Sequence, residues 1–138
     1  NAGLVGSEMC IRDRLYPNDD NKKIILTNAA LTEGLVDASL LYVYSIRYAG
    51  DQKPSEVWQK LQLTKIENTI DYLDKNVSND FNPSKVYISH IGLIVALDYL
   101  NFRKIYDWEM KTKNLDAWHK QVSASMPGYK ETYPKDPS

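Results

Sequence analysis

The most apolar stretch of the chain reads Ile88-Ser89-His90-Ile91-Gly92-Leu93-Ile94-Val95-Ala96-Leu97-Asp98-Tyr99-Leu100-Asn101-Phe102-Arg103. Its apolar residues fall on every side of a helix, so a helix here must be covered by other elements on most of its surface. A strand is the alternative for a short apolar run, but the apolar content continues for about 15 residues, which exceeds an ordinary strand. The sequence therefore predicts a central core helix over residues 88–102.

An amphipathic helix is predicted to precede the core helix and to run to about Arg47. Asp19, Asp20 or Asn21 in the turn before it can cap its first amides. Gly34 lies in its interior, where glycine costs about 1 kcal/mol relative to alanine, so another backbone or a ligand is expected to approach closely there. Apolar positions recur along this helix at spacings of three and four: Ile24, Ile25, Leu31, Leu35, Ala38, Leu41 and Tyr42.

A second amphipathic helix is expected to begin after Ser55, which can cap it, and to end near Asn76. Residues 77–85 are rich in polar and turn-forming residues and are predicted to form a loop. The apolar residues of this helix are Trp58, Leu61, Leu63, Ile66, Ile70 and Leu73.

After the core helix, a further helix is predicted to start near Asn114 and to stop at Pro127 and Gly128. It carries Leu115, Trp118 and Val122 on its apolar face. Residues 129–138 are expected to lie extended on the body. The fold class that follows is all-α, a bundle of four to five helices.

Composition limits the classes of function. The chain has 138 residues, with 17 Lys and Arg against 18 Asp and Glu. This balance argues against nucleic acid as a partner, because phosphate binding needs a clustered excess of basic residues. The longest unbroken apolar run has seven residues, 91–97, so no membrane-spanning helix is expected. A single cysteine, Cys10, excludes an internal disulfide, and a cytoplasmic location is the default expectation.

Residues 1–14 read unlike the rest, with no apolar period and no capping pattern. The decamer at residues 5–14 resembles the translation of a transposase adapter used in sequencing libraries. On this interpretation the genuine domain covers residues 15–138, and an unknown length of protein preceded it. The alternative is an ordinary leader with a stray cysteine.

Three stretches together resemble the C-terminal helical domain of bacterial glutathione S-transferases. The first is Leu15-Tyr16-Pro17, followed by Thr32-Glu33-Gly34-Leu35-Val36-Asp37-Ala38, which is similar to the family's Ala-Asp-Gly-x-x-Asp-Ala. The second is Ala96-Leu97-Asp98-Tyr99-Leu100-Asn101-Phe102-Arg103. The third joins Asp107-Trp108, Leu115-Asp116-Ala117-Trp118 and the tail Thr132-Tyr133-Pro134.

The resemblance implies a parent enzyme that conjugates glutathione to small hydrophobic electrophiles. In that family a thioredoxin-like N-terminal domain holds most of the glutathione and supplies the residue that activates its thiol. That domain would precede Leu15, so no catalytic residue is assigned here, and this chain alone is expected to be inactive. The implied partners are the missing domain, a small electrophile and a second copy in a homodimer. The rival interpretation is a non-catalytic helical interaction module of the same fold.

The family's helical domain forms one wall of the electrophile site, chiefly from its first helix. By helical period Asn28, Leu31, Thr32 and Leu35 form one neighbouring set, which we interpret as this wall. The alternative for these residues is ordinary interface or surface packing.

The sequence departs from the family at the start of the core helix. A Ser or Thr followed by Asp usually forms a capping box there, whereas this chain has Tyr87 and His90. The box is therefore expected to be absent, with Ser84 or Ser89 contributing instead.

Other polar and aromatic residues of the chain could take part in chemistry or ligand binding. His90 and His119 have no metal-ligand spacing, so no metal site is predicted. Glu33 and Asp37 share one helix face, and a solvated like-charge pair is favoured over an acid–base pair. Asp98, if buried, needs a partner from elsewhere in the fold. Core packing, with polar tips reaching outward, is favoured over an aromatic ligand cage for three residues: Trp58, Trp108 and Trp118.

Overall fold

The computed structural model describes residues 14–135, so the adapter-like segment lies almost wholly outside the described residues. The principal helices are α2 (Lys22–Arg47), α3 (Glu56–Asp80), α4 (Ile88–Arg103) and α6 (Asn114–Ser125). Two short helices, α5 (Trp108–Lys111) and α7 (Tyr129–Thr132), flank α6. No strand occurs within the described range. The predicted all-α class is confirmed.

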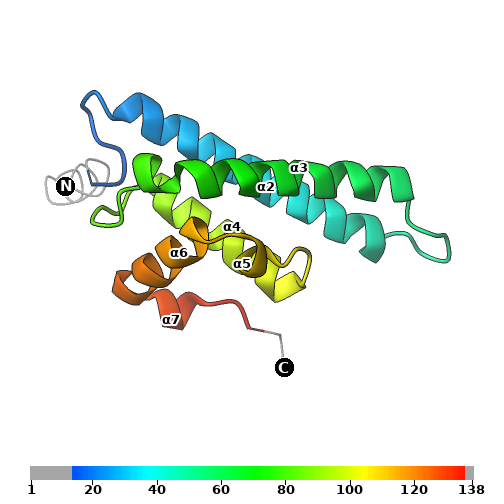
Figure 1. The fold of residues 1–138 in the computed structure, drawn as a ribbon. Coiled ribbons are helices and arrows are strands. Elements are labelled where there is room, and N and C mark those ends of the chain that lie inside the picture. Colours follow the sequence, from blue (N-terminus) through cyan, green and yellow to red (C-terminus); the bar gives the residue numbers. More distant parts are fainter. Residues whose placement is uncertain (1–13, 136–138) are drawn as a thin grey trace, which may run out of the picture.

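Helices α2 and α3 form a long antiparallel hairpin, and α4 lies under it (Figure 1). α2 packs against both α3 and α4, while α6 packs against α3. The hydrophobic core lies between these helices. Its largest fully buried apolar side chains are Leu35, Ile66, Ile70, Leu73, Phe81, Leu93, Leu97, Leu100, Trp108 and Leu115.

The core helix forms where it was predicted. Eight residues of α4 are buried, and Val95, with 54% exposure, is the main apolar side chain on its open side. The helix is therefore covered on most of its surface, as its apolar pattern requires.

Helix α3 begins as predicted but ends later. The Ser55 hydroxyl accepts a hydrogen bond from the Trp58 amide at 3.3 Å, which confirms the cap. The end expected near Asn76 is wrong, because the helix continues to Asp80. Val77 is fully buried, one turn beyond Leu73, so the apolar stripe extends past the polar residues that suggested a loop.

The hydrogen bonding at the start of α2 differs from the predicted side-chain cap. Asn21 occupies the capping position, but its side chain makes no capping hydrogen bond. The Asp19 carboxylate instead accepts from the Asn21 amide at 2.9 Å. The predicted end at Arg47 is confirmed.

The three tryptophans differ in their environments. Trp108 and Trp118 are core residues, as predicted, but their ring N–H groups point to internal carbonyls and not outward. They donate to Leu97 at 3.2 Å and to Phe81 at 2.8 Å. The prediction is wrong for Trp58, which is 42% exposed on the hairpin.

The tail is not wholly extended, since residues 129–132 form the single turn α7. Gly128 allows this turn because it adopts a positive φ of 74°, a conformation that side chains disfavour. Residues 136–138 lie outside the described range.

Helix α2 also has the length and composition of a membrane span, with a mean hydropathy of 1.4 over 18 residues. A search for unbroken apolar runs does not reveal this composition, because polar residues interrupt the apolar positions of α2. Core helices of soluble proteins share this composition, and α2 contributes buried residues to the bundle. Only 33% of that window is buried, so packing against α3 and α4 accounts for part of its apolar character, and the rest lies on the surface of the hairpin.

The close approach expected at Gly34 occurs at another glycine. A Cβ at Gly34 would meet nothing within 4 Å, whereas a Cβ at Gly92 would collide with the Thr32 hydroxyl and lie 3.3 Å from Thr32 Cβ. Gly92 therefore lets α4 approach α2, and the prediction for Gly34 is wrong.

The two glycines provide a matched test. Gly92→Ala should lower the free energy of unfolding by about 1–3 kcal/mol, because the methyl group overpacks the α2–α4 contact. Gly34→Ala should raise it by up to about 1 kcal/mol through helix propensity alone. Urea unfolding measures both, and Thr32→Ala in the Gly92→Ala background should recover part of the loss. Equal effects at the two glycines would contradict this assignment.

Candidate functional site

Three of the four residues assigned to a substrate wall are buried inside the bundle. Asn28, Thr32 and Leu35 are at most 3% exposed. The Asn28 amide donates to the Asp80 carbonyl at 3.2 Å, and the Thr32 hydroxyl donates to the Ala29 carbonyl at 2.8 Å. These side chains hold α2 against its neighbours, and their role in a substrate wall stays a prediction.

Leu31, the fourth member, is partly exposed and packs against the edge of the core. It is therefore the member of this set with apolar surface left for a ligand. Glu33 and Asp37, on the same helix, are both exposed, which agrees with the solvated pair favoured by the sequence.

His90 stabilises the start of α4, which was expected to lack a reciprocal cap. Its Nδ1 accepts a hydrogen bond from the Tyr87 amide at 3.4 Å, and its Nε2 lies 2.9 Å from the Asn82 carbonyl. The Tyr87 side chain makes no capping bond, so half of a capping box is present. Neither Ser84 nor Ser89 supplies the cap, contrary to expectation.

These two contacts define the tautomer of His90. A carbonyl only accepts, so Nε2 carries the proton and Nδ1 keeps its lone pair for the Tyr87 amide. The ring is 1% exposed and makes edge contacts with Phe81 and Tyr87, while Trp118 lies beside it. Burial lowers the pKa of His90 below its ordinary value of 6.5, although the bond to Asn82 opposes the shift.

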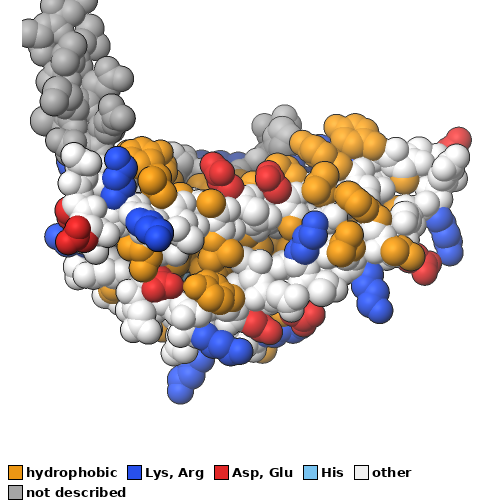
Figure 2. Space-filling view, turned by 90° about the horizontal axis from the view of Figure 1, so that it is seen from above, with side chains coloured by type: hydrophobic (Ala, Val, Ile, Leu, Met, Phe, Trp, Pro, Cys, Tyr) orange, Lys and Arg blue, Asp and Glu red, His pale blue; other side chains and the backbone are white. Residues whose placement is uncertain are grey.

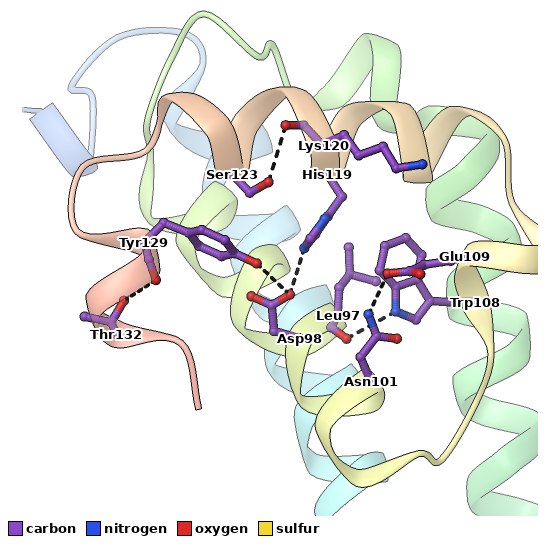
Figure 3. Close-up of polar contacts among 10 residues, drawn as sticks. All are labelled: Leu97, Asp98, Asn101, Trp108, Glu109, His119, Lys120, Ser123, Tyr129 and Thr132. Carbon is purple, nitrogen blue, oxygen red and sulfur yellow. Dashed lines mark hydrogen bonds and ion pairs between the residues drawn. The ribbon is translucent and has the colours of Figure 1, made fainter. Parts of the chain in front are cut away.

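Asp98 is buried and has two partners from other helices (Figure 3). One carboxylate oxygen, Oδ1, lies 2.8 Å from His119 Nε2 and accepts from the Tyr129 hydroxyl at 3.2 Å. The partner that the sequence required for a buried Asp98 is therefore supplied by α6 and α7. Burial first, and then the Asp98 charge, raise the pKa of Tyr129, so its hydroxyl keeps its proton and remains a donor.

An open hollow of about 470 Å³ lies near the end of α4. Across it the Asn101 amide donates to the Glu109 carboxylate at 2.7 Å. It is lined by Leu100, Asn101, Lys104, Tyr106, Asp107 and Glu109. In residues 14–135 no three His, Cys, Asp or Glu side chains are grouped as a metal would require.

The buried polar side chains described above have a structural role. His90, Asp98 and His119 make their polar contacts with other groups inside the protein. The sequence did not predict these pairings, because Asp98 and His119 lie on separate helices and the Asn82 carbonyl lies in the loop before α4. The one local signal was His90 in the position of a capping-box acid.

No protein-family model and no curated protein matches the sequence. Several chains of solved structures do match, including the following two. One is a glutathione S-transferase from Methylobacillus flagellatus with GSH bound, at 25% identity and a TM-score of 0.76, covering 88% of this chain and 61% of that chain. The other is a glutathione transferase family member from Pseudomonas fluorescens Pf-5 with bound S-(propanoic acid)-glutathione, at 30% identity and a TM-score of 0.80, covering 90% and 64%.

The class of protein is thus an all-α bundle with the fold found in bacterial glutathione S-transferases. The chain spans less than two thirds of the length of each structure. Its fold resembles the C-terminal helical domain of these enzymes, and the partial coverage is consistent with that domain alone, the part of the family that the sequence motifs implied.

The lowered pKa of His90 makes stability depend on pH. The unfolded chain binds a proton below about pH 6.5 more readily than the folded chain does. The contribution of His90 is therefore complete above that pH and is lost as the pH falls through the lower, folded-state pKa. We expect the free energy of unfolding to decline from pH 7 to pH 5, and His90→Gln to show a shallower decline. An unchanged slope in His90→Gln would contradict this.

Proposed function

We propose that this chain is the substrate-pocket and dimerisation domain of a glutathione S-transferase that conjugates glutathione to small electrophiles. The observation that carries the proposal is the match to the Pseudomonas fluorescens structure over 90% of this chain, at 30% identity. The helical order and the sequence motifs support the same assignment.

Glutathione is the proposed co-substrate of the full-length protein. Both matched structures contain glutathione or a glutathione conjugate, which supports this ligand class. We propose that a thioredoxin-like domain binds most of the glutathione and activates its thiol. A thiolate must be stabilised for attack at neutral pH, and we assign no residue of this chain to that role. The proposed location is the cytoplasm.

The proposed wall for the electrophile is the α2 set of Asn28, Leu31, Thr32 and Leu35. In this arrangement Leu31 contacts the ligand, because it retains exposed apolar surface. The three buried members keep α2 in position through their contacts with α3 and α4.

Apolar side chains on the α2–α3 hairpin support a docking role. Figure 2 shows hydrophobic side chains gathered over this hairpin. Tyr48 is 72% exposed and Val57 is 82% exposed at its connecting end. Exposed apolar surface of this kind favours association, either in the proposed homodimer or in the alternative function, a non-catalytic interaction module.

The activity proposal makes a direct prediction. The purified 138-residue chain should not conjugate glutathione to chlorodinitrobenzene above the uncatalysed rate, because it lacks an assigned thiol-activating residue. The full-length protein from the source genome should catalyse the reaction. Absorbance of the conjugate measures both. Turnover by the chain alone would refute the assignment of thiol activation to a separate thioredoxin-like domain. A full-length protein that is inactive and has no thioredoxin-like domain would favour the interaction module.

A second prediction tests the wall. In the full-length enzyme, Leu31→Ala should raise the KM for an apolar electrophile about threefold to tenfold through lost apolar contact, leaving the KM for glutathione unchanged. Leu26→Ala is the matched control, since Leu26 is 43% exposed on the same helix and outside the proposed set. Equal effects of the two substitutions would remove Leu31 from the site.

A further inference from the structure

The C-terminal segment, residues 129–135, makes few apolar contacts with the rest of the bundle. Helix α7 contains no buried residue, and Tyr129 is its contact with the hydrophobic core. The Tyr129 ring makes edge contacts with His119 at 6.2 Å and with Tyr133 at 6.0 Å between ring centroids. Tyr129 is therefore the point at which the segment meets the bundle.

The backbone of the segment is bonded locally. The Tyr129 amide donates to Met126 at 3.3 Å, and the Thr132 amide donates to Gly128 at 3.1 Å. Among the described residues, no backbone hydrogen bond joins α7 to α4. Gly128, with its positive φ, follows Pro127 at the junction with α6 and provides a natural pivot.

The polar attachment is a single oxygen of Asp98. The Tyr129 hydroxyl donates to Oδ1 from α7, and His119 bonds to the same atom from α6. A hydrogen bond to a charged acceptor is stronger than one between neutral groups. As Figure 3 shows, Tyr129 and His119 approach Asp98 from different helices, so α7 lies beside the Asp98–His119 pair.

We propose that residues 129–135 form a strap that the Tyr129–Asp98 hydrogen bond latches to α4, and that opens about Pro127 and Gly128 to expose the Asp98–His119 pair. The closed strap shields this pair, and loss of the latch releases the strap without unfolding the bundle. Opening of this kind is local and has a smaller free energy than global unfolding. The latch is independent of the proposed catalytic function.

Hydrogen exchange on the intact chain tests the latch. Tyr129→Phe removes only the hydroxyl, and the hydrogen-bonded amides of Tyr129 and Thr132 should then exchange about tenfold faster, while those of α4 and α6 keep their rates. Tyr133→Phe is the matched control, because it removes from the same segment a hydroxyl that makes no hydrogen bond within residues 14–135. Tryptic cleavage after Lys130 should accelerate in Tyr129→Phe and not in the control.

Three results would overturn the proposal. The first is unchanged exchange in Tyr129→Phe, and the second is an equal increase in both variants. The third is an increase spread through α4 and α6, which would make Tyr129 a general stabiliser of the core. Thermal unfolding of each variant separates this third result from local release of the strap.

Discussion

Burial of helix α4 is the constraint on which the rest of the structure depends. The helix packs against α2, and Trp108 of α5 and His119 of α6 bond to it from another side. It nevertheless carries His90 and Asp98 into the interior. A buried polar group without a partner costs more than its hydrogen bond would contribute. The surrounding elements must therefore place donors and acceptors at defined points along α4.

These partners connect parts of the chain that are distant in sequence. At the start of α4, His90 links the Asn82 carbonyl to the helix backbone. In its middle, Asp98 joins α4 to α6 and α7. The Trp108 ring N–H also donates to α4, at the Leu97 carbonyl. The central helix thus positions both the connecting loops and the C-terminal segment, while apolar packing holds the long hairpin against it.

Much of the fold followed from the sequence, because helical periodicity and capping residues are local signals. They placed α2, α4 and α6 and identified Ser55 as a cap. Contacts between helices have no such signal. Gly34 and Gly92 both lie inside apolar helical segments, so the sequence does not distinguish them. Only the crossing of α2 over α4 leaves no room for a Cβ at Gly92.

The candidate site was harder to predict, because its contacts also join separate helices and leave no local signal in the sequence. The partners of Asp98 lie 21 and 31 residues away, so their identity depends on the packing of α6 and α7. The α2 set was grouped by periodicity, which describes a helix face but not what covers it. Three of its members turned out to face the bundle interior.

The two ring nitrogens of His90 have opposite roles, and this gives the side chain a direction. Nε2 donates to the Asn82 carbonyl of the loop, and Nδ1 accepts from the Tyr87 amide at the start of the helix. A half-turn of the imidazole about its Cβ–Cγ bond would place carbon atoms where the two nitrogens now meet their partners. The ring therefore acts as an oriented spacer between the Asn82 carbonyl and the Tyr87 amide, with a polarity that a symmetric apolar side chain of the same size does not have.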